Sequence, residues 1–167
     1  MHDLFVPQFV RALKNLKVIL RQGEAHAQAK KIDPAVLLET RLIADQFPLV
    51  RQVQISCDTA KLAAARLAGV DAPVHSDTEK SFEELYQRID SVIGYLEGFA
   101  PAAFAQASER KITQPRWEGK WLTGSEYLHC HAMPNIYFHV TTAYAILRAN
   151  GVEVGKKTFL GELPFKQ

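Results

Sequence analysis

Four stretches of this sequence place apolar residues at alternating intervals of three and four positions. The second stretch shows the pattern with Val50, Val53, Cys57, Ala60, Ala64 and Leu67. This spacing brings the side chains to one face of an α-helix. Four helices of roughly 16 to 20 residues, each with one apolar face, bury those faces together as a bundle. The sequence therefore predicts an all-α fold, a four-helix bundle.

Residues typical of helix ends bracket the four stretches. The expected starts are Asp3 as an N-cap, Pro48 at a first helical position, Ser76 with Glu79 as a capping box, and the segment around Pro134. The expected ends are Gly23, Gly69 and Gly151, and the apolar stripe of the third stretch runs to Phe99. These positions predict long helices joined by connections of unequal length.

Two connections are expected to hold structure of their own. A turn at Asp33 and Pro34 opens DPAVLLETRL, which predicts a short extra helix after the first long one. Between the third and fourth helices, RKITQPRWEGKWLTG predicts a small hairpin or an ordered loop. Its Trp117 and Trp121 either cover a pocket or pack the loop onto the bundle.

Composition sets the class of protein. The 167 residues predict a single domain, 1–167, and the net charge of +2 comes from interspersed charges, so no nucleic-acid partner is expected. No window approaches the ~18 apolar residues of a membrane span, so no membrane partner is expected either. MHDLFVPQFV lacks the pattern of a signal peptide, and Cys57 and Cys130 lie in no CxxC motif. We expect a cytoplasmic protein with reduced thiols.

Polar residues recur at four-residue spacing in and before the fourth stretch. Thr123 and Glu126 form a capping box, which predicts a helix from about residue 124. If helical phase continues across Pro134, His131, Asn135 and His139 lie on one face. Histidines one turn apart can present two imidazoles to a zinc, nickel or iron ion.

The metal hypothesis needs more donors than this helix offers. The candidate ligands are His139, Asn135, His131 and Asp58, and the ion would be zinc or nickel. A neutral amide oxygen is a weak ligand for these metals, and Asp58 can instead pair with Lys61. Metal binding and a metal-free site both remain open at this point.

A catalytic role and a structural role are both open for His139. It could act as a general base if a partner fixes its tautomer, or it could be a buried histidine satisfied by a hydrogen bond. Asn135 could orient a substrate or could cap the helix that starts there. The candidate ligand-binding residues around a polar pocket are Asn135, Tyr137, Gln52, Gln54, Trp117 and Trp121.

FPLVRQVQISCD at 47–58 and PNIYFHVTTAYAILRANGVEVGKKTFLG at 134–161 carry a family resemblance. With them, nearly the whole chain resembles an uncharacterised bacterial family, a domain of unknown function, within the DinB-like superfamily. The resemblance implies a four-helix bundle and often a homodimer. It also implies a divalent metal held by three histidines, one on the second helix and two spaced four apart on the fourth. Some members are thiol-dependent transferases or isomerases.

This sequence departs from the implied histidine triad at two of three places. His139 matches the second histidine of the fourth helix, Asn135 replaces the first, and the second helix offers only Gln52 or Gln54. We therefore expect a bundle whose polar pocket, near the start of the fourth helix, binds a small ligand after loss of the triad. The alternatives are a divalent-metal-dependent hydrolase or thiol-dependent transferase using His139, and a non-catalytic structural or interaction homodimer.

Overall fold

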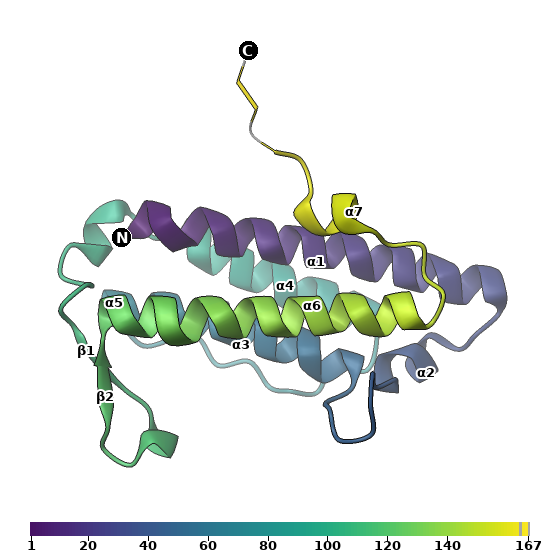
Figure 1. Cartoon of the computed structure of the whole chain (residues 1–167), viewed down its shortest axis with the longest axis horizontal. Coiled ribbons are helices and arrows are strands. Elements are labelled where there is room, and N and C mark those ends of the chain that lie inside the picture. The colour runs from purple at the N-terminus through teal and green to yellow at the C-terminus, as the bar shows by residue number, and fades with distance from the viewer. Residues whose placement is uncertain (164, 167) are drawn as a thin grey trace.

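Four long helices form the body of the protein in the computed structural model, which describes residues 1–163 and 165–166. They are α1 (His2–Lys30), α3 (Leu49–Ala68), α4 (Phe82–Glu97) and α6 (Met133–Ala149). The chief helix contacts are α3 with α6, α3 with α4, α1 with α4 and α1 with α6, so the four helices form a closed ring (Figure 1). The predicted four-helix bundle is confirmed.

The apolar stripes of all four helices meet inside the bundle. Side chains with no exposed surface include Phe9 and Leu16 of α1, Val53 and Leu67 of α3, Leu85 and Ile89 of α4, and Ile136 and Leu147 of α6. Cys57 is also fully buried, and burial raises the pKa of its thiol to about 12. Cys57 is therefore a core residue, while Cys130 is exposed.

The first helix is longer than its sequence pattern predicts. It continues past Gly23 to Lys30 and ends where Lys31 adopts a left-handed conformation, and its N-cap is Met1 in place of Asp3. A Cβ at Gly23 would lie 2.8 Å from the Leu147 side chain. Gly23 thus allows α1 and α6 to approach closely, and the prediction that it ends the helix is wrong.

The capping box of α4 lies five residues later than predicted. The Ser81 hydroxyl accepts a hydrogen bond from the Glu84 N–H at 3.2 Å, and the Glu84 carboxylate accepts one from the Ser81 N–H at 3.0 Å. Ser76 and Glu79 lie in the preceding connection, where the Glu79 carboxylate accepts from Arg88. The Ser76–Glu79 prediction is wrong, since α4 begins at Phe82 and the Glu79 carboxylate binds Arg88 and Gln54 in place of the Ser76 N–H. Ser76 contributes its main-chain carbonyl to Arg88.

The two structured connections are confirmed. Helix α2 (Pro34–Glu39) follows α1, is capped by the Asp33 side chain and buries Leu37 and Leu38. After α4 come a 3-10 turn, η1 (Pro101–Phe104), and an antiparallel hairpin of β1 (Lys111–Thr113) and β2 (Trp121–Thr123). A second 3-10 turn, η2 (Pro115–Trp117), lies between the two strands. The hairpin projects from the end of the bundle where α6 begins (Figure 1).

The helix after the hairpin continues without a break across Pro134. It comprises α5 (Gly124–Glu126), a π-helical segment, η3 (Tyr127–Ala132), and α6. Thr123 and Glu126 form the predicted capping box. The wider π turn leaves room for the ring of a proline, which would clash with the carbonyl four residues earlier in a regular helix. Asn135 therefore lies inside the helix, and the prediction that it is an N-cap is wrong.

The remaining helix, α7 (Lys156–Leu160), packs on α1. Among the described residues, no helix is long and apolar enough to cross a membrane.

Candidate functional site

A pocket of about 540 Å³ lies between α3, α6 and the turn of the hairpin. Its apolar lining residues are Phe47, Ile55, Leu62 and Pro115. The remaining lining residues are polar or charged, and they come from both helices and from the hairpin. The pocket therefore combines an apolar wall with a set of hydrogen-bonding groups.

Helical spacing explains which side chains reach the pocket. Opposite α3, three side chains at intervals of four line the pocket: His131, Asn135 and His139. The helices run antiparallel, since His139 contacts Gln52 near the start of α3 and Asn135 contacts Thr59 one to two turns further on. The structure thus brings the three residues of the predicted face to one pocket.

His139 is fixed in one tautomer by Gln52. The Gln52 Nε2 group donates to the Phe47 carbonyl at 2.9 Å, which leaves its Oε1 as an acceptor. The Nδ1–H of His139 donates to that oxygen at 2.7 Å. The other ring nitrogen, Nε2, is then unprotonated and bonds to no other described residue. His139 therefore presents a hydrogen-bond acceptor at the pocket wall.

The surroundings of His139 keep its ring neutral. Its side chain is 8% exposed, and burial together with the nearby charge of Arg51 lowers its pKa from 6.5 to about 4. At neutral pH the imidazole is uncharged. This favours a role as an acceptor over a role as a proton-exchanging base, which works best with a pKa near the working pH.

The middle of the pocket holds two polar groups that already have partners. The Asn135 side chain donates to the Thr59 hydroxyl at 2.6 Å. Asp58 accepts from Arg88 at 2.9 Å and lies 2.9 Å from the Lys61 ammonium. Two cations therefore balance the charge of Asp58. The pairing with Lys61, three residues later, was predicted from the sequence.

The hairpin end of the pocket is built around His131. Arg116 of η2 donates to His131 Nε2 at 2.8 Å, so His131 is neutral with its proton on Nδ1. Burial and the charges of Arg116 and Arg66 lower the pKa of His131. The Tyr127 ring stacks on His131 with centroids 5.4 Å apart, and the Tyr127 hydroxyl accepts from Arg66 at 3.0 Å. Two guanidinium groups are thus held beside one neutral aromatic cluster.

Several predicted ligand-binding residues do not line this pocket. Tyr137 lines a smaller hollow against α1 and donates to Gln8 at 3.3 Å. Gln54 bonds to Arg51 and Glu79 outside it. Trp117 packs edge-on against the Tyr127 and His131 rings, and Trp121 is 50% exposed beside Lys111. These four side chains lie outside the pocket because the hairpin and the helix phases direct them elsewhere. For Trp117 the contacts match the second alternative, packing of the loop onto the bundle. Gln52 does not line the pocket either, but it bonds to His139, which does.

Several polar pocket residues were missed from the sequence, among them Arg51, Thr59, Arg66, Gln114 and Arg116. Arg66 follows Arg51 by fifteen positions, close to four helical turns, so helical spacing could have placed both on the α3 face. Arg116 and Gln114 have no such signal, because they reach the pocket only through docking of the hairpin.

Comparisons with known proteins agree with this architecture. Residues 1–160 match the family described as "Domain of unknown function (DUF1993)". The chain belongs to the DUF1993 family. It is also similar to the crystal structure of a DinB family member protein from Shewanella denitrificans. The two are 58% identical with a TM-score of 0.96, over 99% of this chain and 94% of that chain. No match is found among curated proteins.

This DUF1993 chain does not fit the three-histidine metal site that its DinB-like resemblance implies. Among residues 1–163 and 165–166, no three His, Cys, Asp or Glu side chains are grouped to hold a metal ion. Asn135 stands where the resemblance implies a histidine, Gln52 is the α3 side chain that contacts His139, and each is engaged in a protein hydrogen bond. His139 alone offers a free imidazole nitrogen there. The donor set is therefore that of a polar binding pocket.

Proposed function

We propose that this DUF1993 protein binds a small polar ligand in the pocket between α3 and α6 without a metal ion. The observation that carries the proposal is the fixed tautomer of His139, whose Nδ1–H donates to Gln52 and whose Nε2 is left as an acceptor at the pocket wall. A ligand hydroxyl or amine is the group that such a nitrogen accepts from. Thr59 and Asn135 keep the neighbouring wall polar.

The enclosing geometry supports binding over a purely structural role for His139. A register-fixing histidine would be surrounded by packed side chains, whereas His139 borders an open pocket of about 540 Å³. That volume is within the range of small-molecule sites. The hydrogen bond to Gln52 holds the ring before any ligand arrives, which reduces the entropy lost on binding.

A metal analysis separates this proposal from the metal-dependent hydrolase or thiol-dependent transferase. Untagged wild type and His139→Ala are purified without chelator, offered zinc, nickel, manganese and iron, and analysed by inductively coupled plasma mass spectrometry. We expect far less than one metal ion per chain in both proteins. Near-stoichiometric metal in the wild type, lost in His139→Ala, would overturn the metal-free proposal.

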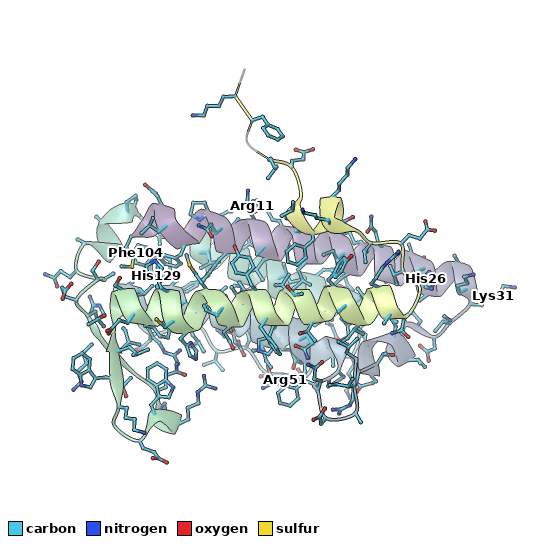
Figure 2. The ribbon with its side chains drawn as sticks, in the orientation of Figure 1. Arg11, His26, Lys31, Arg51, Phe104 and His129 are labelled. Atoms are coloured by element: carbon cyan, nitrogen blue, oxygen red, sulfur yellow. The ribbon has the colours of Figure 1, made fainter. Side chains whose placement is uncertain are left out.

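A ligand screen tests the binding role directly. Small polar compounds are added to ¹⁵N-labelled protein, and Kd is measured for any compound that shifts the amides of Thr59 and Asn135. His139→Ala should weaken such binding by about five- to tenfold, the value of one hydrogen bond of roughly 1 kcal/mol. His129→Ala, at an exposed histidine near the hairpin end of the bundle (Figure 2), is the control and should leave Kd unchanged.

A homodimer is a second proposal, carried by two exposed aromatic side chains. Phe138 of α6 is 55% exposed, and Phe47 before α3, which also lines the pocket, is 54% exposed; exposed apolar surface of this kind can mark a protein–protein contact. Sedimentation velocity of wild type and Phe138→Ser tests it. A dimeric wild type and a monomeric variant are expected, and a monomeric wild type at high micromolar concentration would refute it.

A further inference from the structure

The charges at the pocket do not balance. Three arginines line it, Arg51, Arg66 and Arg116, and the one carboxylate there, Asp58, is already paired with Arg88 and Lys61. Arg51 has its own partner in Asp77. The pocket therefore carries excess positive charge, concentrated at its hairpin end.

Arg66 and Arg116 are held in place by neutral groups. Within the described part of the chain, neither forms an ion pair with a carboxylate. Arg66 donates to the Tyr127 hydroxyl and Arg116 to His131 Nε2, so each guanidinium retains N–H donors for another acceptor. An arginine positioned by a neutral partner keeps its full charge for a ligand.

A buried amide beside them also lacks a partner. Gln114 lines the pocket, is 8% exposed, and its Nε2 group bonds to nothing among the described residues. A buried amide donor without an acceptor costs stability. Rotation of the amide about its last bond exchanges its oxygen and nitrogen, so the unpartnered NH₂ group of this pocket-lining side chain can take either place. It would then add a third donor beside the two arginines.

We propose that the pocket takes a small organic anion whose carboxylate or phosphate group binds between Arg66 and Arg116, with Gln114 as an additional donor. Arginine N–H donors can bind two oxygens at once on either acidic group, the planar carboxylate or the tetrahedral phosphate. The inference rests on the proposed ligand-binding function and names the chemical class of the ligand.

The same geometry sets the shape of that anion. His131 and His139 are eight residues apart on one face, roughly 12 Å along the helix axis. The acidic group would lie at the His131 end, and a hydroxyl or amine at the other end would donate to His139. Ile55 and Leu62 of α3 line the space between them and suit an apolar middle.

Matched probes test the charge preference. Benzoate and phenyl phosphate are the two anionic probes, and benzamide is their neutral counterpart. Each is titrated into ¹⁵N-labelled wild type, with the Gln114 side-chain amide and the Arg66 and Arg116 Nε–H signals as reporters. We expect at least one anion to bind ten times more tightly than benzamide and to weaken as salt is added. The tighter of the two anions identifies the acidic group.

The variants localise the effect. Arg116→Gln changes an exposed residue and Arg66→Gln/Arg116→Gln removes both charges, and we expect anion affinity to fall about tenfold or more in each. Arg11→Gln is the control, at an exposed arginine on α1 away from the pocket (Figure 2), and it should bind as the wild type does. If the double variant does not fold, Arg116→Gln alone decides.

Two other outcomes of the titrations would contradict the anion proposal or the binding function. Equal affinity for benzamide and the anions, or unchanged anion affinity in Arg116→Gln, would refute the anion and leave the binding pocket standing. Failure of all three probes to shift any pocket signal at millimolar concentration would refute the binding function and the anion together.

Discussion

Gln52 connects His139 to the main chain that precedes α3. Its NH₂ group donates to the Phe47 carbonyl, and its amide oxygen accepts from the His139 imidazole. A carboxylate at this position would attract a proton to the ring and favour a cationic imidazole. The neutral amide instead leaves burial and Arg51 to set the protonation of His139.

His139 should make the stability of the protein depend on pH. Its pKa is about 4 in the folded state and near 6.5 when unfolded, so the unfolded chain binds the proton more tightly. The stabilisation is complete above pH 6.5 and is lost as pH falls toward 4, by on the order of 3 kcal/mol. Urea unfolding between pH 4 and 7 measures this loss.

The contribution of His139 is isolated by comparing variants. His139→Gln should show a smaller loss of unfolding free energy between pH 6.5 and 4 than the wild type, since its side chain does not titrate. His129→Gln, at an exposed position, should follow the wild type. An NMR titration that places the His139 pKa near 6.5 would contradict the argument.

Helix α4 shows how tertiary contacts choose among possible helix starts. Two Ser–Glu pairs at capping-box spacing precede its apolar stripe, and only Ser81 with Glu84 forms the box. Glu79 of the other pair accepts hydrogen bonds from Arg88 and Gln54, which hold the connection against α3 and α4. The helix therefore begins where that connection ends.

Removal of the serine hydroxyl distinguishes the two sites. Ser81→Ala should lower the free energy of unfolding by about 1 kcal/mol, because the Glu84 N–H loses its cap. The matched variant Ser76→Ala should have almost no effect, since the Ser76 contact with Arg88 uses its carbonyl. Both are measured by urea unfolding. A larger loss for Ser76→Ala would place the helix start at the earlier box.

For the molecule as a whole, Arg88 joins three parts of the chain. Its side chain is 1% exposed and pairs with Asp58 of α3 and with Asp77 and Glu79 of the connection, each within 3.0 Å. Burial opposes ionisation of both carboxylates, but Arg51 and then Arg88 lower the pKa of Asp77, and a hydrogen bond from Arg88 lowers the pKa of Glu79. The network also balances Asp58, which leaves the pocket with its excess of positive charge.

Loss of Arg88 should destabilise the whole bundle. Arg88→Met removes the cation and leaves three carboxylates close together, so we expect a loss of about 3 to 5 kcal/mol in the free energy of unfolding. Arg21→Met, at an exposed position of α1, serves as the control and should cost far less. Equal losses for the two variants in urea unfolding would show that the network contributes no net stability.

The bundle could be predicted from the sequence because helical periodicity is a local property. The apolar stripes, the short helix after Asp33, the capping box at Thr123 and the shared face of His131, Asn135 and His139 all depend on residues within a few turns of one another. Local spacing therefore placed part of the candidate site correctly as well.

Contacts between distant segments were decided only by packing. Arg66 meets Tyr127 across 61 positions, and Arg116 and Gln114 enter the pocket because the hairpin docks there. Helix α1 continues past Gly23, which packs against Leu147, and Arg88 holds the connection that precedes α4. No local pattern encodes such pairs, because their energy arises only when the helices are already side by side. The acceptor nitrogen of His139 belongs to this second class, since Gln52 lies 87 positions away.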